Sequence, residues 1–483
     1  MNKRLIIYIL GWVLIVEGVA MQLCTITSLI YREHEGIYFF LTGLGAVTAG
    51  VLAVKIKKPK NMVLYQKAGF AATALSWILM SLVAALPFFL SREIPNYLDA
   101  FFESVSGFTT TGATILTNVE SLSHCMLLWR SVMILLGGMG VIVFLLALIP
   151  KLGGQQNIYL MKAESPGPII GKAVPKMRNY AALLYGIYLG LVALEIILLL
   201  CGGMDFFNAV NTSFSTAGTG GFGIHNDNMA AYHSHYLQTV IAVFMMLFGV
   251  NFSVYILILA RKFKQILKIE ELWFYFGFIA VSTLVIALNI MPLYNNDAGE
   301  SFHQSFFYVS SIITTTGFGI GDVNHWPQLS KGIIMIITFV GAMAGSTGGG
   351  FKISRIVILA KEVKKELSML IHPRNIRTIK MDGKSVDHQV TRNTSVYLVV
   401  YLAVFVGSFL LISIEGRDMV TSFTSVSATL NNTGPGLNDV GPVGNYADFT
   451  VLSKLVFIFD MIAGRLELFP ILILLTPSAW KKS

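Results

Sequence analysis

Four short segments of this chain place hydroxyl side chains just before a glycine, between long apolar blocks. They read FFESVSGFTTTGAT, FFNAVNTSFSTAGTGG, FFYVSSIITTTGFG and FTSVSATLNNTGPG. Hydroxyl and backbone carbonyl oxygens can replace the water shell of a monovalent cation, and glycine lets the backbone turn its carbonyls toward an axis. Each segment is therefore a candidate quarter of an ion-binding ring of loops.

The four segments share a register when they are aligned on one glycine each. A phenylalanine then lies eleven residues earlier, a small residue six earlier and an apolar residue four earlier. The two apolar positions are two helical turns apart, which predicts a short helix whose negative dipole end faces the loop. For a single copy, an ordinary outer loop with a helical turn is an equal alternative, but four copies in register argue against it. The predicted cation-binding positions are Thr110, Thr111 and Gly112; Thr216, Ala217 and Gly218; Thr315, Thr316 and Gly317; and Asn432, Thr433 and Gly434.

The composition requires a membrane around these loops. Of the 483 residues, 54% are hydrophobic and only 13% are charged, and the mean hydropathy is +0.68. Apolar blocks of about 20 residues are long enough to cross the hydrocarbon core. We therefore predict an all-α polytopic membrane protein with ten spans, at about 5–30, 37–56, 68–90, 125–149, 180–201, 236–260, 272–292, 331–360, 394–414 and 451–476.

Each glycine segment lies between two of these blocks, which predicts a repeated unit of span, pore helix, filter loop and span around one pore. Non-helical backbone at membrane depth is tolerated when it is buried in protein or lines a water-filled cavity, and four loops around an axis meet that condition. Two extra spans precede the first unit. The predicted divisions are 1–62 for the two-helix domain and 63–178, 179–268, 269–392 and 393–483 for the four units.

The formal net charge of +9 reflects topology rather than a nucleic-acid partner. With both termini in the cytoplasm, most Lys and Arg fall on the inner side, as the positive-inside rule requires. The segments predicted to lie outside are acidic and would concentrate cations. The three widely spaced cysteines predict no disulfide framework. His233 and His235 lack further clustered ligands, so solvated histidines are favoured over a metal site. We expect no cofactor and no enzyme activity.

A glycine-rich stretch interrupts the eighth predicted span. VGAMAGSTGGGFKIS contains Gly345, Gly348, Gly349 and Gly350 ahead of Lys352, and each glycine costs about 1 kcal/mol relative to alanine inside a helix. The helix should therefore break at 341–352, beneath the third filter loop. A phosphate-binding loop does not fit, because Phe351 separates Gly350 from Lys352 and no strand precedes it. A glycine-rich face for close helix packing remains an alternative.

Arg465 is the second unusual feature, because an ionisable residue inside a span is costly and usually faces the protein interior or a wet cavity. It could form a structural bridge with Asp460 or Glu467. Because it belongs to the second span of the fourth unit, it could equally approach the glycine-rich loop from across the pore. We favour the second interpretation, in which Arg465 acts as a positive barrier or latch.

The four units, their filter glycines and the two extra N-terminal spans resemble the Trk/Ktr/HKT superfamily of potassium transporters, and in particular its TrkH branch. The resemblance covers essentially the whole chain. It implies K⁺ bound at the filter residues, a gating loop at the glycine-rich break with Arg465 close to it, and location in the cell inner membrane. It also implies a homodimer and a cytoplasmic nucleotide-binding regulatory subunit of the TrkA or KtrA type. The fourth loop, NNTGPG, is the least regular.

Three functions follow, of which potassium uptake through a channel-like, gated pore is preferred. A potassium symporter driven by sodium or protons is the alternative, but such carriers usually have inverted repeats, whereas all four units here share one orientation. A membrane scaffold would have no use for four ordered filter glycines. The basic inner segment 361–392 is expected to contact anionic lipid, and by the resemblance also the regulatory subunit.

Overall fold

The computed structural model describes residues 3–57, 66–140, 177–372 and 378–477. The predicted division at residue 62 and the end of the predicted span 125–149 lie outside the described residues, as do 373–377 of the basic inner segment. Within the described residues the fold is helical apart from one two-stranded antiparallel hairpin, β1 (Lys380–Met381) and β2 (Lys384–Ser385). The predicted all-α membrane fold is confirmed, with this hairpin as a small addition.

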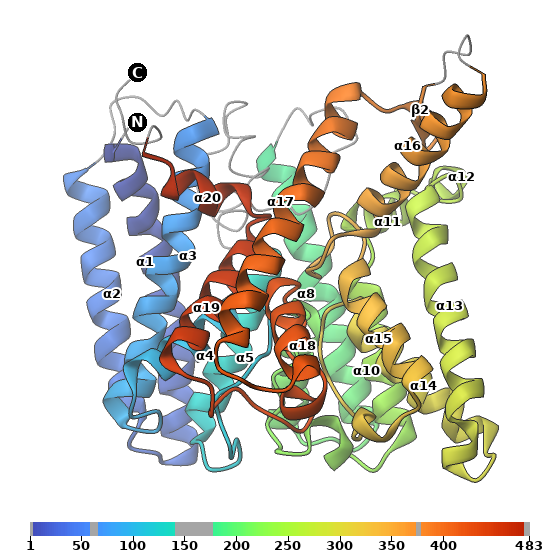
Figure 1. The fold of residues 1–483 in the computed structure, drawn as a ribbon. Coiled ribbons are helices and arrows are strands. Elements are labelled where there is room, and N and C mark those ends of the chain that lie inside the picture. Colours follow the sequence, from blue (N-terminus) through green and yellow to red (C-terminus); the bar gives the residue numbers. More distant parts are fainter. Residues whose placement is uncertain (1–2, 58–65, 141–176, 373–377, 478–483) are drawn as a thin grey trace.

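Two long helices precede the repeated units. α1 (Lys3–Tyr31) packs along α2 (Gly36–Ile56) at one edge of the molecule (Figure 1). Their backbones approach closely where small residues face one another, since a Cβ on Gly11 or Gly18 would meet the carbonyl oxygen of Gly50 or Gly43. Such small-residue contacts drive helix association in lipid, where apolar side chains gain little by leaving the bilayer.

Within the described residues, the first unit contains α3 (Gln66–Ser91), α4 (Tyr97–Phe108) and α5 (His124–Met139). The second consists of α8 (Met177–Cys201), α9 (Phe206–Gly218), η3 (Asn228–Ala231), α10 (His235–Phe248), α11 (Phe252–Leu259) and α12 (Phe263–Ile266). The third consists of α13 (Glu270–Ile290), η4 (Met291–Tyr294), α14 (Ala298–Ile313), η5 (Val323–His325), α15 (Gln328–Val340) and α16 (Ile353–Ile371), followed by the hairpin. The fourth consists of α17 (His388–Ser413), α18 (Met419–Leu430), η6 (Asn438–Val440), α19 (Val451–Arg465) and α20 (Phe469–Leu475).

The short second helix of each unit begins in the same way. An Asn or Asp side chain immediately before the helix accepts a hydrogen bond from a backbone N–H of the first turn, at Asn96, Asp205, Asp297 and Asp418. These caps satisfy donors that have no partner within the helix. The short helices are amphipathic rather than uniformly apolar, and their buried faces carry many hydroxyls. They are α4, α9, α14 and α18.

The ten predicted spans are not ten continuous helices. Six helices in the described part of the chain are long and apolar enough to cross a membrane: α1, α2, α3, α8, α13 and α17. In the second, third and fourth units the last span is interrupted instead. In the second unit α10 and α11 meet at 91°, in the third the break covers 341–352, and in the fourth it lies between Arg465 and Phe469. The sequence analysis expected only the break at 341–352 in the third unit.

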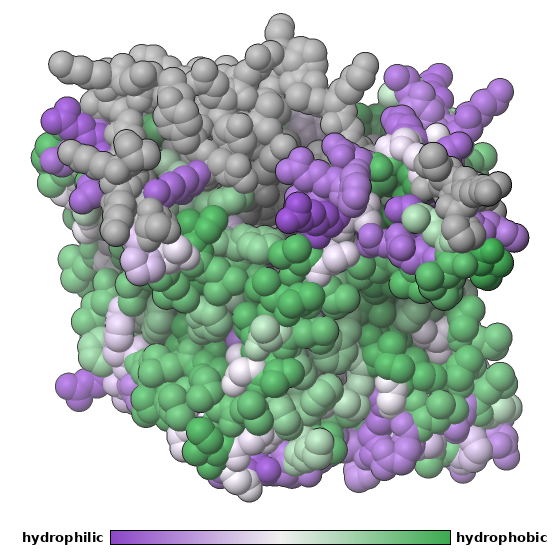
Figure 2. All heavy atoms as spheres, turned by 45° about the horizontal axis from the view of Figure 1, so that its top comes forward, coloured by the Kyte–Doolittle hydropathy of each residue, from purple (hydrophilic) through white to green (hydrophobic). Residues whose placement is uncertain are grey.

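The surface agrees with a membrane location. Figure 2 shows a hydrophobic band around the middle of the visible face, with hydrophilic residues gathered toward the ends. Large apolar side chains that are more than half exposed are frequent on α1, α2, α13 and α17. The start of α1 and the helix α20 lie at the same end of the molecule (Figure 1).

Candidate functional site

The four loops that follow the short helices have the same backbone conformation. In each loop a glycine has a φ between 66° and 88°, and the residue two positions earlier has a φ between 55° and 58°. The residue between them donates its N–H to the carbonyl five positions back, over 2.8 to 3.0 Å. The central residues and their glycines are Thr111 and Gly112, Gly220 and Gly221, Thr316 and Gly317, and Thr433 and Gly434.

The predicted register of the second loop is therefore wrong by three residues. Thr216, Ala217 and Gly218 form the last turn of α9, and the residue equivalent to the other three glycines is Gly221. Because glycines also occupy positions 218 and 220, the sequence could be aligned with the other loops in more than one register. The helix α9 extends about one turn further beyond its phenylalanine than the alignment assumed. The predicted positions in the first, third and fourth loops all lie in the shared conformation.

These loops form a closed ring. A Cβ on any of the four glycines would collide with the backbone carbonyl of the next loop, so that the approach requires glycine. The pairs run in order around the ring: Gly112 against Gly220, Gly221 against Thr316, Gly317 against Thr433, and Gly434 against Thr111. Each loop therefore contributes one glycine and one facing carbonyl to a common axis.

Buried hydroxyl and amide oxygens surround this ring. Thr109 and Thr111 share a hydrogen bond of 2.8 Å between their hydroxyls, and Thr314 and Thr316 repeat it in the third loop. The Asn432 amide bridges the loops by donating to the Thr111 hydroxyl over 2.9 Å. Among the described residues, other buried side-chain oxygens close to the ring have no hydrogen-bond partner. They are the hydroxyl oxygens of Thr110 and Thr433 and the Oδ1 atom of Asn432. The site is rich in acceptor oxygens that a cation could use.

An open cavity leads to the ring on the side where the short helices begin. Its lining includes all four ring glycines, Gly112, Gly221, Gly317 and Gly434, which is a second indication that Gly221 is the equivalent residue. Arg130 also lines this cavity, although its side chain is almost completely buried. A cavity that touches the same backbone position of four loops is a route to their shared axis.

Arg130 is neutralised within the protein and links the first two loops. Its Nε lies 2.9 Å from Glu103 Oε1, Nη1 donates to the Gly223 carbonyl over 3.0 Å, and the guanidinium covers the ring of Phe222. Glu103 in turn accepts from the hydroxyl of Thr114 and the N–H of Ile115. A buried ion pair is tolerated when such additional hydrogen bonds satisfy both partners. The sequence analysis identified neither Arg130 nor Glu103 as a site residue.

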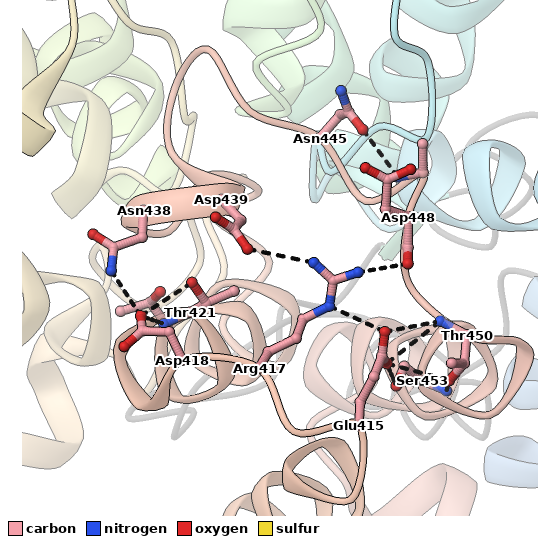
Figure 3. Close-up of polar contacts among 12 residues, drawn as sticks. Glu415, Arg417, Asp418, Thr421, Asn438, Asp439, Asn445, Asp448, Thr450 and Ser453 are labelled. Atoms are coloured by element: carbon pink, nitrogen blue, oxygen red, sulfur yellow. Dashed lines mark hydrogen bonds and ion pairs between the residues drawn. The ribbon is translucent and has the colours of Figure 1, made fainter.

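A polar network supports the segments that flank the fourth loop (Figure 3). Arg417 contacts Glu415 over 3.0 Å, Asp439 over 3.3 Å and the Asp448 carbonyl over 2.5 Å. It thereby joins the segment before α18 to η6 and to the approach to α19. Asp418 accepts hydrogen bonds from the Thr421 N–H and from the Asn438 side chain, and these bonds hold its pKa below the ordinary value.

On the other side of the ring lies the break between α15 and α16. The Gly349 N–H donates to the Thr315 hydroxyl over 2.6 Å, and a Cβ on Gly348 would meet the Thr314 carbonyl at 2.8 Å. The Lys352 ammonium donates to the Gly348 carbonyl. The break, which we call the 341–352 loop, thus packs directly against the ends of the third and fourth short helices, as the sequence analysis expected for the third.

The same loop fills the bend of the second unit. Met343 N–H donates to the Gly249 carbonyl over 3.2 Å, and Phe252 N–H donates to the Gly345 carbonyl over 3.0 Å. Two interrupted helices therefore satisfy one another's free backbone groups. Gly345, predicted as part of the glycine-rich loop, lies at this contact, and Gly350 lies against Gly341 within the loop.

Arg465 reaches the loop from the opposite side, as preferred in the sequence analysis. Nη1 donates to the Thr347 carbonyl over 2.8 Å, and Nη2 donates to the Gly138 carbonyl over 2.7 Å and to that of Gly137. Of the two carboxylates considered as partners, Asp460 accepts from Ser408 and Glu467 pairs with Arg355 over 2.6 Å. Arg465 therefore connects the last spans of the first, third and fourth units below the ring.

Comparison with known proteins identifies the family. Residues 39–482 match the family TrkH, described as cation transport protein. The chain is 35% identical to the Trk system potassium uptake protein TrkH of Salmonella typhimurium and to that of Escherichia coli, with all of each chain covered. It is 30% identical to the Escherichia coli protein TrkG over 99% of both chains.

A solved structure agrees with this match over the whole fold. The crystal structure of the potassium transporter TrkH from Vibrio parahaemolyticus superimposes with a TM-score of 0.89, at 32% identity, and the match covers 100% of both chains. Sequence and fold thus give the same assignment over their full length. The chain belongs to the TrkH family of cation transport proteins.

Proposed function

We propose that this protein takes up potassium across the cell inner membrane through a channel-like pore. The observation that carries the proposal is the ring in which Gly112, Gly221, Gly317 and Gly434 each pack against a carbonyl of the next loop. The family membership and the names of the potassium uptake relatives support the choice of cation.

The proposed filter consists of the ring carbonyls and the hydroxyls beside them. Carbonyl oxygens in a ring can replace the hydration shell of K⁺, and selectivity follows from their number, spacing and field. The C-terminal ends of α4, α14 and α18 precede their loops directly, so their negative dipole ends favour a cation on the axis. In the second loop, Thr219, Gly220 and Gly221 take the filter role that the sequence analysis gave to Thr216, Ala217 and Gly218.

The proposed gate consists of the 341–352 loop and Arg465. The loop lies against the inner side of the ring, and its backbone is held there by bonds from Gly349 to Thr315 and from Arg465 to Thr347. Arg465 adds a buried positive charge below the ring, on the same side as the buried Lys352 side chain, and this charge opposes the passage of a cation in this conformation. Opening requires the loop to leave the axis and the contacts of Arg465 to break.

The test is ion flux through the purified protein in liposomes. Rubidium flux that runs down its own gradient, with neither a sodium nor a pH difference, supports the channel-like pore. Flux that requires a sodium or proton gradient supports the symporter instead and overturns the channel-like mechanism. Two variants separate loss of the filter from general damage to the protein. Gly317→Ser in the ring should impair selective flux, whereas Gly332→Ser in α15, where an added Cβ meets no neighbour, should leave it unchanged.

Partners and orientation belong to the same proposal. We expect both termini in the cytoplasm, a homodimer, and a cytoplasmic nucleotide-binding regulatory subunit of the TrkA or KtrA type that contacts the basic segment 361–392. Copurification with such a subunit, and its loss when the lysines at 364, 365 and 384 are replaced together by glutamine, supports this surface. Retention of binding in that variant contradicts it.

A further inference from the structure

Glu271 in the first turn of α13 binds both the 341–352 loop and the start of α16. Its side chain is buried, and Oε1 accepts a hydrogen bond from the Ala344 N–H over 2.7 Å and from the Ser354 N–H over 3.2 Å. Ala344 lies within the loop, four residues after the end of α15, and Ser354 lies in the first turn of α16. One carboxylate oxygen thereby ties the first part of the loop to the helix that follows it.

The contact replaces a cap that α16 lacks. The residue before α16 is Lys352, with a φ of 68° and no side-chain cap hydrogen bond. The first N–H groups of a helix have no partner within the helix and favour a negative charge. Glu271 supplies the missing acceptor from another helix, so this contact at the start of α16 lasts only while α13 and α16 keep their present positions.

The preceding residue, Glu270, connects α13 to the hairpin beyond α16. Its N–H donates to Asp382 Oδ1 over 2.9 Å, and its carboxylate pairs with Lys361 of α16. The Lys361 ammonium also donates to the Lys380 carbonyl over 2.7 Å. Glu270 therefore contacts the hairpin β1–β2 at the surface, whereas the next residue, Glu271, contacts the buried loop.

We propose that Glu271 is a positioning residue that holds the 341–352 loop against the ring, and that the Glu270–Asp382 contact couples the hairpin to this hold. The inference rests on the proposed gate. A force or binding event that moves the hairpin shifts the start of α13, and the Glu271 carboxylate moves with it. This chain of contacts is a physical route by which the hairpin can bias the two-state loop.

The first experiment measures basal rubidium flux in liposomes. Glu271→Ala removes the acceptor of two buried N–H groups, and these two hydrogen bonds exist only in the held conformation. We expect basal flux to rise roughly tenfold, because their loss shifts the equilibrium toward the open conformation. Glu271→Gln keeps an acceptor oxygen and should restore most of the wild-type value. The matched control is Glu33→Ala, which removes a carboxylate that accepts hydrogen bonds from the N–H groups of His124 and Cys125 at the start of α5 and should leave flux unchanged.

The outcomes separate this inference from the proposed gate. If Arg465→Gln raises basal flux and Glu271→Ala does not, the gate stands and the role of Glu271 is overturned. If neither variant raises flux, the gate itself is wrong. Should Glu271→Ala fail to fold, Glu271→Asp shortens the side chain by one methylene and should raise flux in the same direction. A rubidium-to-sodium flux ratio that falls together with the rise indicates damage to the ring and contradicts a positioning role.

The coupling to the hairpin is tested by a double-mutant cycle. Asp382→Ala removes the acceptor of the Glu270 N–H and should raise basal flux by roughly two- to threefold, because this contact is more exposed. In the Glu271→Ala background it should have no further effect, since the linkage is already cut. Additive effects of the two substitutions, or no effect of Asp382→Ala on its own, overturn the coupling.

Discussion

The register of the second loop makes the sharpest prediction. Gly221→Ala places a methyl group where the Thr316 carbonyl now lies, at a backbone φ of 66°. The left-handed conformation alone costs a non-glycine residue about 1–2 kcal/mol. To restore an ordinary carbon–oxygen separation of about 3.3–3.6 Å, the Thr316 carbonyl must move away from the axis it shares with the other three loops.

We expect this displacement to act on selectivity before it acts on folding. If the altered carbonyl loses about 1.4 kcal/mol of preference for K⁺ over Na⁺, the ratio of rubidium to sodium flux falls tenfold. The assay is flux of both ions through purified protein in liposomes, with thermal unfolding in detergent measured in parallel. Gly186→Ala is the matched control, because this α8 glycine of the same unit has no neighbour within 4 Å of an added Cβ.

Gly218→Ala provides the contrast. A Cβ there would collide with the Ile134 carbonyl of α5, which should lower the unfolding temperature through poorer packing of α9 on α5. The folded fraction should keep the wild-type rubidium-to-sodium flux ratio. Loss of selectivity in Gly218→Ala at an unchanged unfolding temperature, together with normal selectivity in Gly221→Ala, would refute the register.

Three further predictions follow from the contacts around the ring. Arg465→Gln removes charged donors to three buried carbonyls, and basal rubidium flux in liposomes should rise roughly tenfold without a change in selectivity; unchanged or lower flux in folded protein contradicts the latch. Arg130→Gln leaves Glu103 buried without its counter-charge, at a cost of about 3–5 kcal/mol. The unfolding temperature of this variant should fall further than that of the double variant Glu103→Gln/Arg130→Gln. Equal decreases in unfolding temperature would show that the pair is not coupled. Asp418 has a lowered pKa in the folded state, so its stabilising effect is complete above the ordinary aspartate value of about 3.9 and is lost as the pH falls through the folded value. Near neutral pH, the unfolding temperature of Asp418→Asn should therefore lie below that of the wild type, and the two temperatures should converge in acid. A difference that persists in acid would contradict the assignment.

The fold was largely predictable because its signals are long or repeated. Apolar blocks indicated the membrane location, and four glycine segments indicated four units. The cost of glycines inside a helix located the 341–352 break. Arg465 was found because a charge in an apolar block needs a partner, and the structure gives it three carbonyl partners across unit boundaries.

The second loop was misplaced because one apolar spacing was given more weight than the loop itself. The alignment required phenylalanine eleven residues before the glycine, which Phe207 satisfies for Gly218. The sequence also held the correct signal. Gly221, Phe222 and Gly223 repeat the order of Gly317, Phe318 and Gly319, so an alignment on Gly-Phe-Gly gives the register found in the structure.

Other features had no local signal. Glu103 and Arg130 are 27 residues apart, and no spacing rule joins them before the helices are packed. Glu271 follows another glutamate at the start of an apolar block, where charges are ordinarily solvated. The bend at Gly249–Asn251 was missed because the apolar block continues through it, and only the hydrogen bonds to Met343 and Gly345 explain why the backbone can leave the helix there.

The central claim is that the four-loop ring conducts potassium selectively. The most direct measurement imposes potassium, rubidium and sodium gradients one at a time across liposomes that contain the purified protein. We predict that potassium and rubidium each move down their own gradients with no other gradient present, that sodium moves much more slowly, and that Gly221→Ala abolishes this difference. Equal movement of all three ions in the wild type, or potassium movement only when a sodium or proton gradient is supplied, would contradict it.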